Sequence, residues 1–335
     1  MYLKKKERIT MRYAIIDIGS NTVKMNLYDT FDDKRPELIL GESRTVGLIS
    51  YSQHKQLPEE GIGRLIETLS YYGELAAKLH ADRVHCFGTA SLRAVENGGE
   101  VVEKVLDKTG MKIDIVSGEN EALLSFGGLK FGLGDQLRSG VMIDIGGGST
   151  ELLGFVDGLA VRAVSLEFGC LSLFRKFVSG AILPNKKEIE KIKKFVDEKL
   201  AGADWLPQWS SSVYIVGGTA RSLGRLHSEH FKQPYTPYGY TMPSGDVKDV
   251  VNRFKLPKDE DLNVMIRNLP DRLHTIIPGI IAYRRIINAI GGSEIIVSET
   301  GIREGYLMQM LKNAEDAHGE AREEFKLSGS ADVRS

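Results

Sequence analysis

The sequence predicts an α/β protein built of two lobes that face each other across a central cleft. The main observation is a near repeat: segments 14–22 (AIIDIGSNT) and 141–150 (VMIDIGGGST) carry Asp17 and Asp144, 127 positions apart, in the same pattern. In each segment an apolar run typical of a buried strand contains the Asp near its end, and small residues then form a turn before a second run. This pattern indicates two β-hairpins that arose as a repeated unit. The length of 335 residues also favours about two domains.

The first half of the chain continues with strands and helices in alternation, which is typical of an α/β fold. Strands are predicted at 38–46, 83–88 and 112–116, and helices at 59–80 and 98–109. A further helix is predicted through 121–127, with Ser117 as its N-cap.

The second half repeats this scheme. After the hairpin we expect strands at 159–166, 213–216 and 294–297, and helices around 169–178, 186–202, from 219, 245–255, 276–289 and 303–312. The predicted lobes are 11–135 and 136–304, with a C-terminal helix at 305–325 returning to the first lobe. Gly301 and Gly305 suit a chain that turns and packs closely there. Residues 1–10 and 326–335 are expected to be disordered.

Composition restricts the classes of function. The formal net charge is −1, so no global positive field favours a nucleic acid or a membrane surface as partner. No apolar run reaches the roughly 18 residues of a membrane span, and no signal peptide is evident. Cys86 and Cys170 lack metal-ligand spacing, which favours a reduced, cytoplasmic setting. His227 and His230 lack an evident third ligand and are expected on a helix surface.

The hairpin turns have the composition of phosphate-binding loops. Glycines and small hydroxyl residues let backbone N–H groups surround an anion, and a carboxylate on the adjoining strand can hold a divalent cation against it. A single turn of this kind is more often an ordinary tight turn, but the repetition favours phosphate binding. The candidate phosphate-binding residues are Ser20, Asn21, Thr22, Gly146, Gly147, Gly148 and Ser149.

Three carboxylates are candidate ligands of Mg²⁺ or another divalent cation. Asp17 and Asp144 occupy the strand ends of the two hairpins, and Glu151 lies on the second arm of the second hairpin. Mg²⁺ is usually held by few carboxylates, with phosphate oxygens and waters completing its octahedron. Alternatively, Glu151 is an exposed strand carboxylate.

Seven motifs extend the pattern along the chain. They are Asp17-Ile-Gly-Ser-Asn21-Thr22, Gly88-Thr-Ala-Ser-Leu-Arg93-Ala, Ser117-Gly-Glu-Asn-Glu121-Ala, Asp144-Ile-Gly-Gly-Gly-Ser149-Thr-Glu151, Ser165-Leu-Glu-Phe-Gly169-Cys, Val216-Gly-Gly-Thr219-Ala and Ser298-Glu-Thr-Gly-Ile-Arg303-Glu-Gly305. In this order they resemble the exopolyphosphatase and guanosine pentaphosphate phosphatase family, in its short two-domain form. The resemblance covers residues 13–312 and implies the two-lobed fold of actin, hexokinase and Hsp70, a duplicated ribonuclease H-like fold.

The resemblance implies that Glu121 and Arg93 are catalytic and that Gly218 and Thr219 also bind substrate phosphate. A carboxylate can orient a water and accept its proton, and an arginine fork can hold a phosphate at two points. From the residues alone, Glu121 could merely favour a helix start, and Arg93 could be a solvated arginine. Leu123 and Lys24 stand where many members have other residues, Arg at the first position and Arg or His at the second.

The expected function is that of a phosphoric anhydride hydrolase, an exopolyphosphatase that releases orthophosphate from the end of linear inorganic polyphosphate. Guanosine pentaphosphate is the alternative substrate, and a kinase or a nucleotide-binding sensor are the alternatives of other classes. Candidates for a basic track are Arg44, Lys130, Arg138, Arg162, Arg175 and Lys176, each of which could equally be an ordinary solvated cation. We therefore expect short chains to be preferred, unless a homodimer extends the basic surface.

Overall fold

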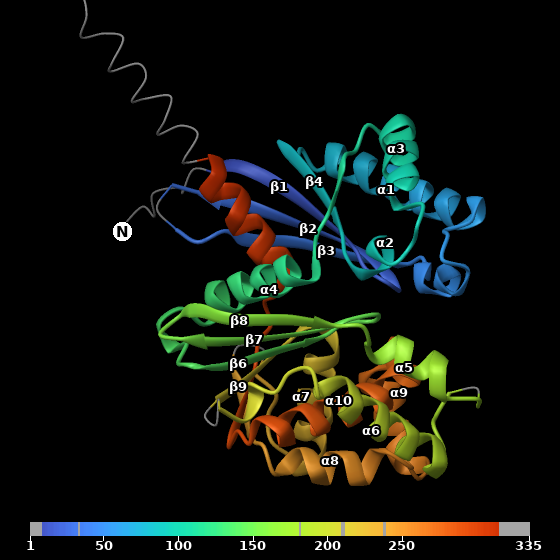
Figure 1. The fold of residues 1–335 in the computed structure, drawn as a ribbon. Helices are drawn as coiled ribbons and strands as arrows, with labels where there is room; N and C mark the ends of the chain where they lie inside the picture. Colours follow the sequence, from blue (N-terminus) through green and yellow to red (C-terminus); the bar gives the residue numbers. More distant parts are fainter. Residues whose placement is uncertain (1–8, 33, 181, 209–211, 237–238, 315–335) are drawn as a thin grey trace, which may run out of the picture.

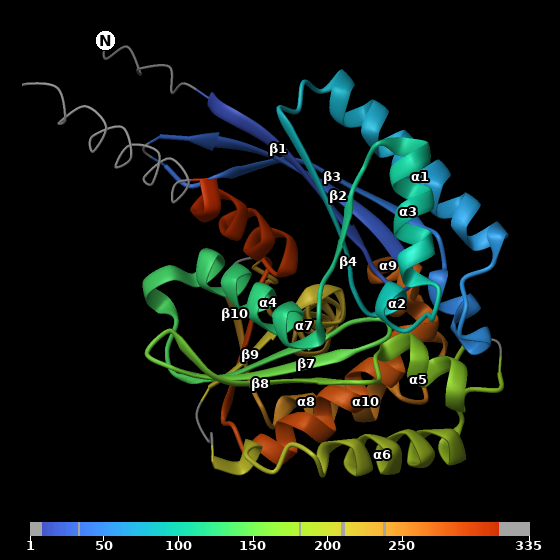
Figure 2. The ribbon, with the colours of Figure 1, turned by 45° about the horizontal axis from the view of Figure 1, so that its top comes forward.

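The computed structural model describes residues 9–32, 34–180, 182–208, 212–236 and 239–314. Its strands form two sheets, each covered by helices, and Figures 1 and 2 show the sheets in separate lobes. The predicted α/β class and the two-lobed arrangement are therefore confirmed. Among the described helices, none combines the length and the apolar character that a membrane crossing requires.

The first sheet has the strand order β3-β2-β1-β4-β5. Its strands are β1 (Ile9–Ile18), β2 (Thr22–Phe31), β3 (Glu37–Thr45), β4 (Arg83–Gly88) and β5 (Ile113–Ile115). The first three strands are antiparallel neighbours, whereas β4 runs parallel to β1. Helices α1 (Glu59–Lys78) and α3 (Gly98–Thr109) bury their apolar faces on this sheet, and the short α2 (Ala90–Arg93) follows β4.

The second sheet has the order β10-β11-β9-β6-β7-β8. Its strands are β6 (Gly140–Ile145), β7 (Thr150–Val156), β8 (Leu159–Leu166), β9 (Ser212–Val216), β10 (Tyr240–Pro243) and β11 (Glu294–Val297). The orders β3-β2-β1-β4 and β8-β7-β6-β9 correspond strand by strand, and in each the fourth strand is parallel to the third. The repeat seen in the sequence is thus a repeat of topology.

Helices on the outer side of the second sheet form the larger core. They are α5 (Cys170–Phe177), α6 (Lys186–Leu200), α7 (Gly217–Phe231), α8 (Asp246–Phe254), α9 (Asp259–Asn268) and α10 (Leu273–Ile290). The central helix α10 is buried along most of its length and is rich in isoleucine, because it packs against α5, α6, α7 and α8. It ends at Gly291, whose φ of 74° suits glycine.

Two helices occupy the space between the lobes. Helix α4 (Gly118–Leu133) packs on β7 and β8 through residues such as Phe126, while its Leu124 joins the cluster beneath the first sheet. The C-terminal helix 302–314 packs on that first sheet through Tyr306 and Leu307. Figures 1 and 2 show this red helix beside α4.

Glycines allow these two helices to approach backbone to backbone. A Cβ added to Gly128 would overlap the carbonyl oxygen of Gly301, and a Cβ on Gly305 would overlap that of Leu124. Thr300 adds a hydrogen bond from its hydroxyl to the carbonyl of Gly128, at 2.7 Å. Glycine is unfavourable inside a helix. Gly128 and Gly305 are therefore explained by the crossing and not by helix propensity.

The sequence placed most elements, with identifiable exceptions. Ser117 is the N-cap of α4 as predicted, but α4 extends to Leu133. Helices α2 and α9 and strand β10 were missed because each is short or lacks a strong period. Strand β1 begins at Ile9, so the N-terminal extension assigned to 1–10 was two residues too long. Residues 1–8 and 315–335, and with them most of the predicted 305–325 helix, lie outside the described residues. The lobe boundary at 135/136 stays a prediction.

Replacing Gly128 with alanine should destabilise the protein, because its Cβ has no space at the helix crossing. We expect a loss of about 1–3 kcal/mol in the free energy of unfolding, or failure to fold. Gly63→Ala is the matched control, since Gly63 lies exposed on α1 with open space around its Cβ. That change should stabilise by about 0.5–1 kcal/mol. Urea unfolding measures both, and equal midpoints would contradict the crossing.

Candidate functional site

The two hairpin turns have the same construction. Gly19 donates its N–H to the carbonyl of Thr22 at 3.1 Å, and Gly146 donates to that of Ser149 at 3.0 Å. Strand register pairs Asp17 with Lys24 in the first hairpin and Asp144 with Glu151 in the second. At equivalent positions, therefore, one hairpin carries a cation opposite its aspartate and the other carries an anion.

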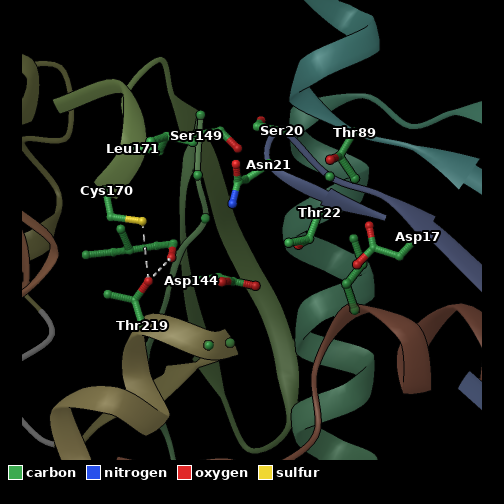
Figure 3. A pocket seen from close by; sticks show the side chains of 18 of the residues that line it. Asp17, Ser20, Asn21, Thr22, Thr89, Asp144, Ser149, Cys170, Leu171 and Thr219 are labelled. Carbon is green, nitrogen blue, oxygen red and sulfur yellow. Dashed lines mark hydrogen bonds between the residues drawn. The ribbon is translucent and has the colours of Figure 1, made fainter. Parts of the chain in front are cut away.

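The turns meet at their tips and enclose a cavity of about 380 Å³. A Cβ added to Gly148 would lie 2.7 Å from the hydroxyl oxygen of Ser20, so a larger residue there would displace that hydroxyl. Figure 3 shows Asn21 and Ser149 near one end of the cavity, with Asp144 and Asp17 entering from opposite lobes. The cleft containing both Asp17 and Asp144 was predicted from the repeat and is confirmed.

Glu121 projects from the first turn of α4 into this cavity. Its side chain is about 12% exposed, and Arg93 donates a hydrogen bond to its Oε2 at 2.8 Å. Burial raises the pKa of Glu121 to about 7, with the charges of Asp144 and Asp17 adding to the effect, while Arg93 opposes it. Arg93 also donates to the carbonyl of Val116 at 2.7 Å, which fixes the guanidinium against the carboxylate.

Two further carboxyl groups, those of Asp144 and Glu151, line the cavity together with Glu121. Ser125 donates to Asp144 Oδ2 at 2.9 Å, and Ser165 donates to Glu151 Oε1 at 2.8 Å. Burial raises the pKa of Asp144 to about 6. It also raises the pKa of Glu151 well above its ordinary value, and the charges of Glu121 and Asp144 act in the same direction. Glu151 is buried, so the alternative of an exposed strand carboxylate is wrong.

Four cations line the same cavity: Lys24, Arg221, Arg272 and Arg303. Burial lowers the pKa of Lys24 to about 7, and the charges of the three arginines contribute to this shift. Arg303 is paired with Asp17 at 3.1 Å and Arg221 contacts Glu299 at 3.7 Å. Arg303 and Arg221 thus have carboxylate partners within the protein, whereas the lowered pKa of Lys24 shows that this buried ammonium would be stabilised by a further anion. The arrangement therefore favours an anionic ligand.

The N-terminus of α7 opens into the cavity beside Arg272. Gly217 has a φ of 87°, and a Cβ there would lie 2.6 Å from Asp144 Oδ1, while a Cβ on Gly218 would overlap the Arg272 guanidinium. The first turn of a helix offers N–H groups to anions. Thr219, by contrast, donates its hydroxyl to the carbonyl of Ile145 at 2.9 Å, so that hydroxyl is used within the protein.

The cavity collects nearly every site residue that the sequence suggested. Twelve of them line it: Asp17, Ser20, Asn21, Thr22, Glu121, Asp144, Gly146, Gly147, Gly148, Ser149, Gly218 and Thr219. Glu151 lines it as well. Arg93 is not among the described lining residues and instead contacts Glu121, so the structure places it behind the carboxylate. The catalytic, phosphate-binding and metal-binding roles of these residues stay predictions.

Sequence reasoning missed the cations of the cavity. Arg221 and Arg272 were not singled out, and Arg303 was noted only as part of a motif. The expected basic track is dispersed, and its members have local partners: Arg175 donates to the carbonyl of Ser50, Lys130 donates to that of Gly158, and Arg44 stacks over Tyr71. Arg221 follows the Gly-Gly-Thr turn by two residues, and this proximity is a signal that could have identified it.

The predicted histidine interpretation needs correction. His227 is completely buried, with Nδ1 2.7 Å from the Tyr240 hydroxyl and Nε2 3.0 Å from Asp246 Oδ2. It is therefore not on a helix surface. Its burial is possible because polar groups of β10 and α8 satisfy both of its ring nitrogens. Cys86 and Cys170 are free and buried, and Cys170 borders the cavity next to Thr219.

The carboxylates fit a divalent cation only with help from a ligand. In the part of the chain that the structure describes, no three His, Cys, Asp or Glu side chains are placed to hold a metal by themselves. Asp17, Asp144 and Glu151 therefore do not form a complete protein site. Mutual repulsion among Glu121, Asp144 and Glu151 would be relieved by a cation, however, and Mg²⁺ commonly takes one or two carboxylates plus phosphate oxygens. The donor set fits that mode.

These features define a class of protein: a two-lobed α/β protein whose cleft combines two glycine-containing hairpin turns with buried carboxyl groups and cations. The sequence model of the Ppx/GppA phosphatase family matches residues 29–314, and the chain belongs to that family. The family resemblance noted in the sequence is thereby confirmed.

Individual relatives agree with this assignment at modest identity. The chain is 23% identical over 310 residues to exopolyphosphatase 1 of Mycobacterium bovis, covering 91% of this chain and 90% of that protein. It is 26% identical over 327 residues to the bifunctional 3-dehydroquinate synthase/phosphatase of Fusobacterium nucleatum, covering 90% of this chain but only 46% of that protein. A crystal structure of the Aquifex aeolicus family member superposes with a TM-score of 0.75 at 26% identity, covering 90% and 98% of the two chains.

The carboxyl cluster predicts a pH-dependent stability in the absence of metal. Because folding raises the pKa of Asp144 and Glu121 to about 6 and 7, the folded state binds protons more tightly than the unfolded chain. The free energy of unfolding should therefore decrease as pH rises from about 4 to 7, by on the order of 1–3 kcal/mol. Glu151→Gln should reduce this slope, as should Mg²⁺ with orthophosphate.

Denaturant unfolding at several pH values between about 4 and 8 measures the effect. Glu67→Gln is the control, since Glu67 is exposed on α1, and it should leave the slope unchanged. A Glu151→Gln slope equal to that of the wild type would contradict the mutual repulsion of the carboxyl groups.

Proposed function

We propose that the protein is an exopolyphosphatase that releases orthophosphate from the end of linear inorganic polyphosphate by attack of water, with Glu121 as the general base. The observation that carries the proposal is the geometry of Glu121. It is a buried carboxylate at the cavity wall, held by Arg93, with a pKa raised to about 7. A general base works best when its pKa lies near the operating pH.

Arg93 leaves half of the carboxylate available. Its guanidinium engages Oε2, so Oε1 is the oxygen that can orient a water and accept its proton. This contact also lowers the pKa of Glu121, opposing burial, and so keeps a fraction of the group ionised at neutral pH. Arg93 would act on the base and not on the phosphate, which differs from the phosphate-holding role inferred from its fork shape.

The remainder of the cavity suits the phosphate chain. The turn N–H groups of both hairpins and the first turn of α7 can surround the terminal phosphoryl group, and Lys24, Arg221 and Arg272 can neutralise the phosphates behind it. A bound Mg²⁺, held by Asp144 with Asp17 or Glu151, would supply charge neutralisation on the phosphoryl oxygens. Positioning and electrostatic stabilisation account for most of the catalysis in phosphoryl transfer.

The lining favours polyphosphate over guanosine pentaphosphate. Glycines, hydroxyl residues and charged residues dominate it, and none of the described lining residues is aromatic. Protein sites commonly bind splayed bases by stacking on aromatic or arginine side chains. Of these two kinds of side chain, only arginine lines the cavity here, and the arginines are expected to contact phosphates instead of a base. A relative named guanosine-5'-triphosphate,3'-diphosphate pyrophosphatase, from Vibrio cholerae, is 32% identical over 164 residues, so the nucleotide is kept as a test substrate.

The test is orthophosphate release from tripolyphosphate, long polyphosphate, guanosine pentaphosphate and ATP, each with and without Mg²⁺. Values of kcat/KM rank the substrates directly, because specificity is the ratio of these values. We expect kcat/KM to be higher for both polyphosphates than for either nucleotide. A higher kcat/KM for guanosine pentaphosphate than for the polyphosphates would make that nucleotide the proposed substrate. If none of the four compounds is turned over, the proposed function is rejected.

Glu121→Gln should lower kcat by a factor on the order of 10² to 10⁴ while the fold and substrate binding are kept. The amide retains the size and can still accept a hydrogen bond from Arg93, but it cannot take a proton from water. Glu119→Gln, an exposed change in the same helical turn, is the matched control and should have wild-type turnover. Comparable kcat values for the two variants would remove Glu121 from the mechanism.

The pH profile should report the ionisation of Glu121. Because only the deprotonated carboxylate can act as base, kcat/KM should fall as pH decreases through the pKa of Glu121, which is about 7 without metal and is expected to be lower with Mg²⁺ bound. Arg93→Ala removes the contact that lowers this pKa, so the acidic limb should move to higher pH as well as losing amplitude. Profiles at saturating Mg²⁺ for wild type and variant measure the shift. An acidic limb at the same pH in both would show that Arg93 does not act through Glu121.

A further inference from the structure

The C-terminal helix supplies a side chain to the cavity from outside both hairpins. Arg303, in the first turn of helix 302–314, donates from Nη1 to Asp17 Oδ2 at 3.1 Å. The two side chains are only 16% and 13% exposed. Arg303 Nε also lies 3.2 Å from the side-chain oxygen of Asn26 once that amide is oriented to accept. The guanidinium thus has two fixed contacts on the first sheet.

Glu304, the next residue, fastens this turn to strand β2. It is buried, and its Oε1 shares the single hydroxyl proton of Tyr28 with the side-chain oxygen of Asn26. Its Oε2 accepts from the backbone N–H of Gly301 at 2.8 Å, which closes the start of the helix. Hydrogen bonds to a charged acceptor are stronger than neutral ones, and the low dielectric of a buried site strengthens them further. Arg303 is therefore presented by a turn that is held at both ends.

The same turn is tied to the helix between the lobes. Thr300 donates to the carbonyl of Gly128 in α4, and a Cβ added to Gly128 would overlap the backbone of Gly301. The chain has just left β11 in the second sheet when it makes these contacts. The orientation of Asp17 in the first lobe therefore depends on residues that follow the second lobe in sequence.

We infer that Arg303 is a positioning residue for Asp17, and that Glu304 and Tyr28 position Arg303. This inference rests on the proposed function, in which Asp17 helps to hold a divalent cation against the substrate phosphates. Arg303 engages Oδ2 and so leaves Oδ1 as the oxygen for that cation. Outer groups that orient a metal-binding carboxylate typically change metal affinity by 10–100-fold when removed.

Tyr28→Phe is the most informative variant, because Tyr28 is not among the described residues that line the cavity. It removes the hydroxyl that contacts Glu304 and, at 2.7 Å, the side-chain amide of Asn26. Tyr13→Phe is the matched control: Tyr13 belongs to the same buried cluster, and its hydroxyl contacts only the sulfur of Met11, at 3.5 Å, among the described residues. The pair separates a role of the Glu304 contact from a general effect of removing a buried hydroxyl.

Two measurements apply to both variants. The first is the Mg²⁺ concentration for half-maximal phosphate release, with kcat and KM determined separately. The second is Mn²⁺ binding followed by electron paramagnetic resonance with orthophosphate present and no polyphosphate, which needs no turnover. We expect Tyr28→Phe to weaken metal binding about tenfold in both, with KM for tripolyphosphate little changed, and Tyr13→Phe to match the wild type.

Arg303→Lys provides the second variant. It keeps the positive charge but cannot make both contacts of the planar fork, so metal binding should weaken at least as much as in Tyr28→Phe. Metal titrations equal to wild type in Tyr28→Phe and Arg303→Lys would overturn the inference. A rise in KM alone for Arg303→Lys, with unchanged Mn²⁺ binding, would also overturn it and make Arg303 a direct phosphate ligand.

The Mn²⁺ measurement keeps this result separate from the proposed function. If the wild type releases phosphate from none of the test substrates, the proposed function fails, whereas the comparison of Mn²⁺ binding still decides the positioning role. If the wild type is active and the variants bind Mn²⁺ as it does, only the positioning role fails. Thermal unfolding of each variant establishes that the compared proteins are folded.

Discussion

The backbone-to-backbone crossing of α4 and helix 302–314 is the constraint on which the rest of the molecule depends. Gly128 and Gly305 let each helix touch the carbonyl groups of the other, so the separation between the two lobes is set by main chain and not by adaptable side chains. Each helix also delivers a site residue from its first turn, Glu121 in one case and Arg303 in the other. The crossing therefore fixes the position of Glu121 relative to Asp17 as well as the packing.

Charge is distributed unequally within the cavity, and this follows from the two hairpins. Register places Lys24 opposite Asp17 but Glu151 opposite Asp144, so the duplicated hairpins have diverged: one pairs its aspartate with a cation and the other pairs it with a second carboxyl group. Burial of these groups in their charged forms is unfavourable, as the lowered pKa of Lys24 and the raised pKa of Glu151 indicate. A phosphate chain with a divalent cation complements both at once. Such strain is typical of functional sites, where like charges and burial are combined to shift pKa values.

Arg93 illustrates how a structure can reassign a residue without removing it from the site. Its sequence context suggested a phosphate ligand, but its contacts are the carboxylate of Glu121 and the carbonyl of Val116. The cations that line the cavity come instead from other elements: strand β2 and helix α7, the turn before α10 and the C-terminal helix. Local motifs do not report such convergence, because the four residues lie between positions 24 and 303 of the sequence.

The sequence alone determined the class of fold, the two hairpins and the identity of most turn residues. These follow from periods of apolar residues and from small residues at turns, which act within one element. Its resemblance to a family was needed to single out Glu121. Only the tertiary structure decided that Lys24, Arg221, Arg272 and Arg303 meet in one cavity, that His227 is buried, and that Asp17 is held by the C-terminal helix. The physical reason is that periodicity records which face of an element is buried, whereas the meeting of element ends depends on how the lobes pack across the glycine crossing.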